Sequence, residues 1–402
     1  MVVSKTAYIV LGLACSLLMS APEAGAQTDV EEVAEKLVDA GFANVRVLDE
    51  GSRKVFAIQN DRYKIQSQGI ARALKIIKDC DNLDTLSYKV IATYYDIPQV
   101  TLTYEPSVGS WKATYRLDDS WKQIRNIRKQ NSSIGKVDIV VYPQFSFMNL
   151  IITQVYQSLF QISPAVEVSL WPGSKFTALV KIPVWNDGYS TTESYTHPYN
   201  LTISQRFRDP WNLNLFGKLT AGVFTGNRHG VALEMFYPFK DERFSLEAQL
   251  GALGLGYWDG FVYHFDDIDQ FCWSFGPNFY SPTLQTQFSL RAQKWLMGEK
   301  GIKFEMIRHF RFCSIGFYAE KGFMSDAHTN GGFRFMVSLP PYGNKRRGYL
   351  PRVTTGSMGM TYNANNEQYY YKEYKTEASD NIMEHNGFNP LYIEREIVKL
   401  NY

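Results

Sequence analysis

Residues 244–250 read FSLEAQL, and residues 287–293 read QFSLRAQ. In both stretches an apolar side chain alternates with a polar one. Successive side chains of a β-strand point to opposite faces, so this period of two predicts strands with one apolar and one polar face. An amphipathic helix would instead repeat its apolar positions every three to four residues.

The same alternation recurs along the chain on both sides of these stretches. It is strict at residues 166–171, 176–182, 231–235, 302–306 and 333–339, and weaker at 201–207, 215–224, 270–275, 313–320 and 352–362. Turn-forming residues such as Gly226-Asn227 and Asn330-Gly331-Gly332 separate the segments. The pattern predicts a mainly β fold with about 12 strands over residues 161–362.

Alternation of this kind is typical of both soluble β-domains and membrane barrels. In a soluble sheet the apolar face covers a core, whereas in a membrane barrel it meets lipid and the polar face lines a lumen. Here the hairpin series continues without a covering helix, and aromatic residues gather near strand ends, as at Tyr257-Trp258 and Phe261–Phe265. We therefore predict an antiparallel outer-membrane β-barrel, with a soluble β-domain as the alternative.

Residues 1–26 have the features of a secretory signal peptide. Lys5 precedes the apolar stretch YIVLGLACSLLM at residues 8–19, and Ala24-Gly25-Ala26 offers a small-residue cleavage site. No later stretch has the roughly 20 apolar residues that a membrane-spanning helix needs. Basic and acidic residues are interleaved and the net charge is only +2, which argues against nucleic acid as a partner.

Residues 27–105 are predicted to form a small α/β domain in the periplasm. Apolar residues at helical spacing indicate a helix that ends at Gly41 and a second helix at residues 66–77, each followed by two short strands. This order favours an antiparallel sheet with helices on one side. Residues 106–160 form a connecting region of mixed structure. It begins with the linker-like PSVGS, and its residues 149–160 suit either a strand or a buried helix. At the other end of the chain, residues 363–402 form a polar tail.

The sequence contains no catalytic constellation, so we expect no enzymatic activity and no cofactor. The six histidines are scattered without metal-ligand spacing, and Cys80, Cys272 and Cys313 are too few for a zinc site or a disulfide framework. A disulfide bridge between Cys272 and Cys313 is an alternative that the sequence leaves undecided. The glycine-rich GALGLG at residues 251–256 lacks the strand-to-helix context of a nucleotide-binding loop and fits a crowded or kinked strand end.

A binding or conduit surface inside the barrel is the remaining candidate site. Aromatic faces and charged or amide groups together suit sugars, and ligand pockets combine such elements. The polar faces and strand ends provide eight candidates for contact with the lumen or a glycan: Trp171, Lys181, Arg206, Glu234, Glu247, Arg291, Lys303 and Arg334. The alternative is that the tryptophans anchor the barrel in the membrane and the charges merely solvate the lumen.

Several local strings resemble the YjbH/GfcD-like outer-membrane proteins, which are encoded with exopolysaccharide and capsule secretion genes. The strings are AGFANVRV (40–47), QNDRY (59–63), DIP (96–98), EVSLWPG (167–173), KIPVWND (181–187) and GGFRF (331–335). The resemblance covers about residues 28–345 and includes no catalytic motif.

This resemblance implies a non-enzymatic barrel in the outer membrane of a Gram-negative bacterium. Its expected role is the export or surface assembly of an exopolysaccharide or capsule, and its expected partners are outer-membrane lipid, the polysaccharide and periplasmic export proteins. A structural or ligand-binding surface barrel, adhesin-like or porin-like, is the alternative.

Overall fold

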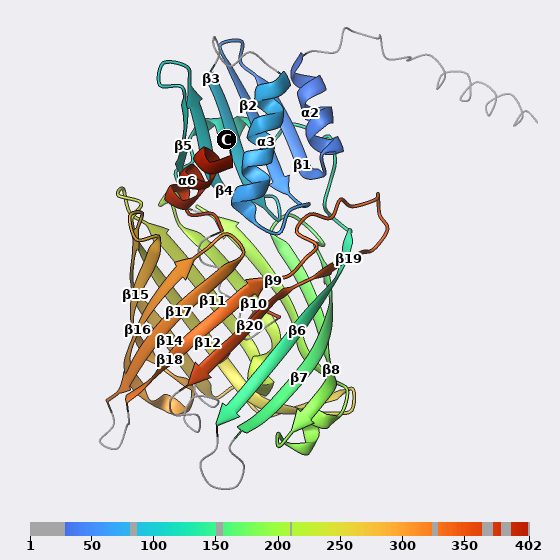
Figure 1. The fold of residues 1–402 in the computed structure, drawn as a ribbon, viewed down its shortest axis with the longest axis vertical. Helices are drawn as coiled ribbons and strands as arrows, with labels where there is room; N and C mark the ends of the chain where they lie inside the picture. Colours follow the sequence, from blue (N-terminus) through green and yellow to red (C-terminus); the bar gives the residue numbers. More distant parts are fainter. Residues whose placement is uncertain are drawn as a thin grey trace, which may run out of the picture.

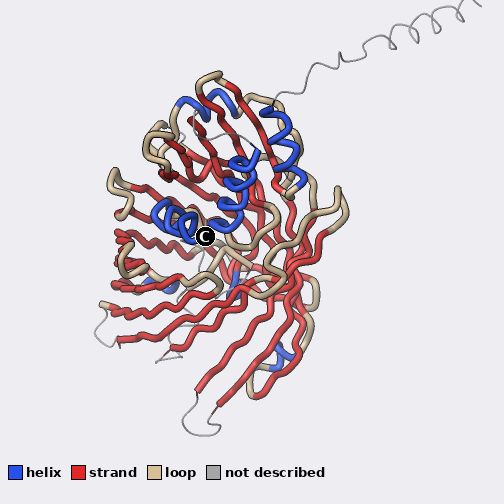
Figure 2. The backbone as a smooth tube through the Cα atoms, turned by 45° about the horizontal axis from the view of Figure 1, so that its top comes forward, coloured by secondary structure: helices blue, strands red, loops and turns tan. Residues whose placement is uncertain are grey.

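The computed structural model describes residues 29–80, 87–149, 156–209, 211–323, 329–363, 373–378 and 387–400, so the predicted signal peptide lies outside the described residues. The fold is mainly β and consists of two sheets, one of five strands and one whose main path has 14 strands. The larger sheet curls into a nearly closed barrel, and the smaller sheet with its helices lies over one end of it (Figures 1 and 2). No helix among the described residues is long and apolar enough to cross a membrane.

The N-terminal sheet has the strand order β1-β2-β3-β4-β5. Its elements are α2 (Asp29–Asp39), β1 (Phe42–Asp49), β2 (Arg53–Asn60), α3 (Gln66–Cys80), β3 (Ser87–Tyr94), β4 (Ile97–Glu105) and β5 (Ser110–Thr114). The predicted α/β sheet is present, but the prediction that all its strands are antiparallel is wrong, because β2 and β3 pair in parallel. The helix α3 connects these two strands, and such a crossover returns the chain in its original direction. The predicted linker at 106–110 consists of the turn between β4 and β5 and the first residue of β5.

Helices cover both faces of this sheet. On one face α2 and α3 bury residues such as Leu37 and Ile70, and the C-terminal helix α6 (Pro390–Leu400) adds Ile393 and Ile397 to the same core. On the other face the short helix α4 (Asp119–Ile124) contributes Ile124. The last described element of the chain is therefore part of the N-terminal core.

The large sheet begins at Val137, within the region expected to be connecting structure. Its strands are β6 (Val137–Asn149), β7 (Tyr156–Val168), β8 (Ser174–Asp187), β9 (His197–Arg208), β10 (Phe216–Phe224), β11 (Arg228–Pro238), β12 (Phe244–Asp259), β14 (Gln270–Ser281), β15 (Thr286–Lys294), β16 (Lys300–His309), β17 (Cys313–Gly322), β18 (Thr329–Ser338), β19 (Arg352–Thr355) and β20 (Ser357–Asn363). A further short strand, β13 (Val262–Phe265), pairs with the end of β12. These strands contain most of each stretch of strict alternation, with residues 169–171 and 339 just beyond the ends of β7 and β18.

The barrel closes through a parallel pair, so the prediction of a purely antiparallel barrel of about 12 strands is wrong. β19 pairs in parallel with β6, and β20 pairs antiparallel with β18. Only Gly356 separates β19 from β20, so the 14 strands of the path occupy 13 positions around the wall. An odd number of positions in an up-and-down wall makes the first and last strands run in the same direction. A Cβ at Gly356 would lie 2.2 Å from the ring of Tyr142, so glycine lets the last strand pass close to β6.

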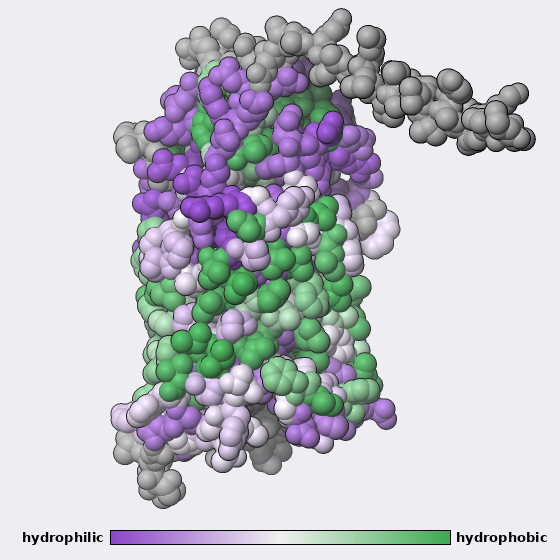
Figure 3. Space-filling view, turned by 90° about the vertical axis from the view of Figure 1, so that its right-hand side faces the viewer, coloured by the Kyte–Doolittle hydropathy of each residue, from purple (hydrophilic) through white to green (hydrophobic). Residues whose placement is uncertain are grey.

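The barrel wall is apolar outside and polar inside. The outward side chains form an exposed apolar band between the hydrophilic N-terminal domain and the far end (Figure 3). Its members include Val166, Ile182, Ile203, Leu219, Val231, Leu250, Phe275, Leu290, Phe304, Phe317 and Phe333. The inward side chains include the buried polar residues Gln161, Lys175, Thr202, Lys218, Asn278, Ser289, Lys303 and Arg334. A water-soluble β-domain has the opposite distribution.

Ion pairs attach the N-terminal domain to the closing seam of the barrel. Asp138 on β6 accepts hydrogen bonds from Arg352 at 2.7 and 2.8 Å and from Arg346 at 2.7 Å. The same two arginines pair with Asp61 of the N-terminal domain, at 3.1 Å from Arg346 and 3.7 Å from Arg352. One charge cluster therefore joins the first strand, the last strand and the domain.

Candidate functional site

A cavity of about 840 Å³ lies inside the upper barrel, below the N-terminal domain. It is lined by residues of β2 and the loop after it, by inward-facing residues of most barrel strands and by part of the C-terminal tail. Six of the eight predicted residues line it, namely Arg206, Glu234, Glu247, Arg291, Lys303 and Arg334. Strand alternation places them there, since each lies on the polar face of its strand.

Trp171 and Lys181 are not among the residues that line this cavity. Trp171 lies in the turn between β7 and β8, is 46% exposed, and donates its indole N–H to Gln205 at 2.6 Å. Lys181 faces inward and is buried, but its ammonium lies over the ring of Tyr199, 3.5 Å from the centroid. Trp171 is therefore part of the rim of the barrel, and Lys181 contributes to the packing of its wall.

Charged side chains of the inner wall pair between strands, and the two partners lie on neighbouring strands or one strand apart. Lys175 lies 3.0 Å from Glu167, Lys218 lies 2.8 Å from Glu234, and Arg334 lies 3.0 Å from Glu305. Arg291 pairs with Glu247 and donates a further hydrogen bond to Asn278. Salt screens the attraction within a buried ion pair only weakly. These pairs therefore hold the lumenal charges in fixed positions.

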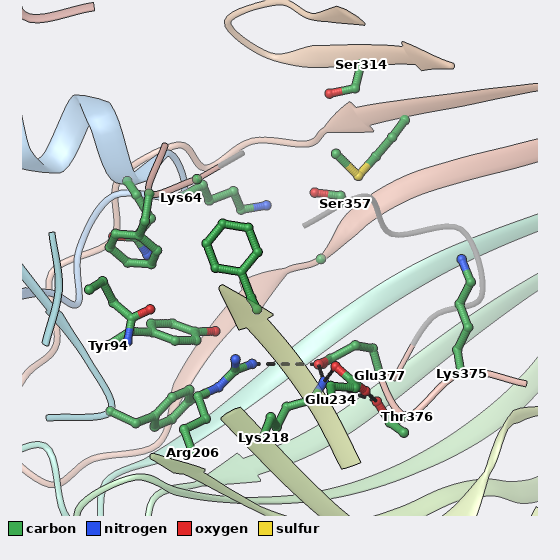
Figure 4. Close-up of a pocket in the computed structure, with 18 of the residues that line it drawn as sticks. Lys64, Tyr94, Arg206, Lys218, Glu234, Ser314, Ser357, Lys375, Thr376 and Glu377 are labelled. Atoms are coloured by element: carbon green, nitrogen blue, oxygen red, sulfur yellow. Dashed lines mark hydrogen bonds and ion pairs between the residues drawn. The ribbon is translucent and has the colours of Figure 1, made fainter. Parts of the chain in front are cut away.

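The C-terminal tail returns into this lumen. Its described part, Glu373–Ala378, is here called the lumenal segment. Figure 4 shows Glu377 converging with Lys218 and Arg206, which come from two neighbouring strands. The Glu377 carboxylate lies 2.6 Å from the Lys218 ammonium, 3.7 Å from the Arg206 guanidinium and 4.0 Å from the Lys175 ammonium.

A second carboxylate of the lumenal segment contacts a different part of the wall. Glu373 pairs with Lys303 of β16 and lies 3.6 Å from Arg334 of β18, whereas the partners of Glu377 belong to β8, β9 and β10. The strands β11, β12, β14 and β15 lie between these two groups in the wall. The lumenal segment therefore reaches from one part of the wall to another across the interior.

The positive surroundings keep both tail carboxylates ionised. Burial by itself raises the pKa of Glu373, but the charges of Lys303 and Arg334 outweigh it and lower that pKa to about 2. Burial likewise opposes ionisation of Glu377, and the charges of Lys218, Lys175 and Arg206 outweigh it and hold its pKa well below the usual range. Both groups are therefore anions bound by lumenal cations at neutral pH.

The mouth of the cavity combines aromatic and basic groups. The Arg206 guanidinium stacks over Tyr94 of the N-terminal domain, 4.9 Å from the ring centroid. Tyr115, Phe216 and Phe236 pack edge to face beside it, with centroids 5.4–5.6 Å apart. Lys64 points toward the same space from the loop after β2, and burial lowers its pKa to about 8. Aromatic faces beside fixed charges can bind a polar ligand with apolar patches, such as a sugar.

No local pattern in the sequence indicates that the tail belongs to the site. Lys218 and Glu305 share the polar parity of their strands, but Glu373 and Glu377 follow the last predicted strand in a polar stretch without periodicity. Opposite charges that lie far apart in the sequence leave no local pattern. Only the path of the chain in three dimensions brings them together.

A metal site or a disulfide would add other chemistry to the described part of the chain. No three His, Cys, Asp or Glu side chains converge there to hold a metal ion. Cys272 and Cys313 are both free, so the bridge left open by the sequence is not formed. The chain matches no protein-family model, and no curated protein matches it.

Proposed function

We propose that this chain is a non-enzymatic β-barrel of a Gram-negative outer membrane, with its N-terminal domain in the periplasm, and that it serves export or surface assembly of an exopolysaccharide or capsule. The observation that carries the membrane assignment is the inverted distribution of side chains. Large apolar residues such as Phe275 and Phe317 are each more than 50% exposed on the outer wall, while Lys303 and Arg334 are buried within. Soluble monomers rarely expose a continuous apolar band of this extent, whereas lipid requires it.

The polysaccharide assignment is supported by the chemistry of the cavity and by the resemblance to YjbH/GfcD-like proteins. The cavity carries aromatic rings, such as those of Tyr94 and Tyr115, beside fixed charges such as Arg206 and Arg291. Its position below the N-terminal domain suits a ligand that enters from the periplasm, where export proteins would be the partners.

An in-frame deletion strain, complemented from a plasmid, tests this function. Surface and secreted polysaccharide are measured for amount, chain length and location in the deletion strain and in strains that carry the wild type or Arg291→Ala. We expect polymer to be lost or retained in the periplasm in the deletion strain and restored by the wild type. Unchanged polymer in a strain that normally makes it would overturn the export assignment.

A surface barrel that binds external ligands is a second candidate. The β12–β13 hairpin exposes Phe261 and Phe265 at more than 70%, and these rings could contact a partner. A binding screen of intact cells that carry or lack this hairpin separates the two functions, because export would survive trimming of the hairpin and ligand binding would not.

A further inference from the structure

We propose that the lumenal segment is an internal substitute for an acidic ligand, and that the same cation sites bind the carboxylates of an acidic polysaccharide when the segment leaves. This inference rests on the proposed function and names the chemical class of its substrate. The cations concerned are Lys175, Arg206, Lys218, Lys303 and Arg334.

The first observation behind this inference is the pairing of charges in the barrel wall. Three wall carboxylates pair with three of these cations, as Glu167 does with Lys175, Glu234 with Lys218 and Glu305 with Arg334. The two carboxylates of the lumenal segment contact all five. Buried cations such as Lys218 and Lys303 need anionic partners, so removal of the segment would favour any chain that brings carboxylates to the same two places.

The barrel wall also forms hydrogen bonds with the lumenal segment between Glu373 and Glu377. The backbone N–H of Thr225 donates to the carbonyl of Lys375 at 3.2 Å, and the N–H of Lys375 donates to the Thr225 hydroxyl at 2.8 Å. Thr376 donates its hydroxyl to Glu234 at 2.6 Å and accepts from Lys218 at 3.1 Å. A glycan presents hydroxyls, and an acidic glycan also presents carboxylate oxygens, so it could form equivalent bonds.

Gly251 provides a separate sign that the wall fits the segment. A Cβ at this position would lie 2.4 Å from the hydroxyl oxygen of Tyr374 and 2.8 Å from the sulfur of Cys272. Tyr374 packs here against Phe224, with ring centroids 5.6 Å apart. The first glycine of the GALGLG string is therefore crowded by the tail.

The segment can leave its sites and remain attached to the protein. It follows β20, whose last residue pairs at the end of the barrel away from the N-terminal domain, and it precedes α6, which is buried in the N-terminal core. An acidic polymer that enters below the N-terminal domain would compete for Lys218 and Arg206 first. A neutral polymer lacks the carboxylates needed to replace Glu377 and Glu373, so it would not displace the segment.

Conductance of the full mature chain in planar lipid bilayers tests the inference. We compare the wild type with E373Q/E377Q and with E31Q/E105Q, a matched control whose two glutamates are exposed on the N-terminal domain. Loss of two charge-assisted contacts should raise the open probability of E373Q/E377Q by about tenfold or more, with no change in the control. Polygalacturonate added on the side of the N-terminal domain should then block the open variant at concentrations where dextran of equal length does not.

A second pair of variants leaves all lumenal charges in place. G251A should displace Tyr374 and open the channel, and G251A/Y374F, which removes the closest clashing atom, should close it again in part.

The outcomes distinguish this inference from the proposed function. If the wild type inserts but both E373Q/E377Q and G251A conduct as it does, or if polygalacturonate blocks no better than dextran, the tail inference is overturned while the barrel stands. If the wild type fails to insert into bilayers or outer membranes at all, the proposed function falls.

Discussion

Glu377 and Lys218 form an ion pair of 2.6 Å inside the barrel, although one follows the last strand of the wall and the other lies within β10. Thr376 extends the contact, since it bonds both Lys218 and Glu234. The final part of the chain is therefore a component of the lumen as well as of the N-terminal core.

Acid should release the lumenal segment. The pKa of Glu373 is lowered to about 2 from its usual 4.5, and that of Glu377 is lowered further. A carboxyl group with a depressed folded-state pKa stabilises the folded state fully above its unfolded-state pKa and loses that contribution as the pH falls toward the folded value. Conductance of the wild type should rise as the pH falls from about 4.5 toward about 2, while E373Q/E377Q should stay open throughout. Identical pH profiles for both would contradict this assignment.

A charge on the outer wall should prevent stable insertion. Leu290 is 50% exposed on the outward face of β15, and Leu290→Arg should cost about 2–4 kcal/mol if it faces the middle of a bilayer. Gln293→Arg, on the inward face of the same strand, is the matched control and should cost less. Urea unfolding in lipid vesicles and the amount recovered in outer membranes measure both. A soluble domain would show the reverse order, because exposed substitutions there usually change stability by only about 0.5 kcal/mol.

The closing seam should depend on Asp138. Its carboxylate bonds Arg352 at 2.7 and 2.8 Å and Arg346 at 2.7 Å, so Asp138→Asn should lower the free energy of unfolding by about 2–3 kcal/mol. Hydrogen exchange of residues 138–141, which pair with β19, should accelerate with it. Asp119→Asn, whose side chain is 85% exposed, should change stability by less than about 0.5 kcal/mol. Unchanged exchange at the seam would show that backbone pairing alone closes the barrel.

The N-terminal domain should require the C-terminal helix. Ile393 of α6 is fully buried in the N-terminal core, so Ile393→Ala should destabilise that domain by about 2–5 kcal/mol in thermal unfolding. Val398→Ala on the same helix is the control, because Val398 is 59% exposed. Equal stability of the two variants would mean that α6 does not hold the domain together.

The strands and their faces could be predicted from the sequence because they depend on local pattern. The alternation at 244–250 identifies β12 and correctly assigns Glu247 to the inner face and Leu250 to the outer face. The N-terminal helices follow from the spacing of residues such as Leu37 and Ile70. In each case the signal lies within one element.

The number of strands and the closure could not be predicted in the same way. Residues 149–160 have apolar side chains at both odd and even positions, so no alternation marks the end of β6 or the start of β7. The last strand is broken at Gly356, where Tyr142 from the first strand packs close by. The path of the tail depends on pairs such as Lys303–Glu373, which are 70 residues apart and have no local signature.

The most direct test of the central claim is the surroundings of Leu290 in membranes that contain the whole protein. Nitroxide labels are placed at Leu290→Cys and, for comparison, at Phe261→Cys in the exposed hairpin, after Cys80, Cys272 and Cys313 have been replaced. We predict that the label at 290 collides with dissolved oxygen and is shielded from a water-soluble nickel chelate, while the label at 261 is open to the chelate. Equal access of the chelate to both positions would contradict the claim that the apolar band faces lipid.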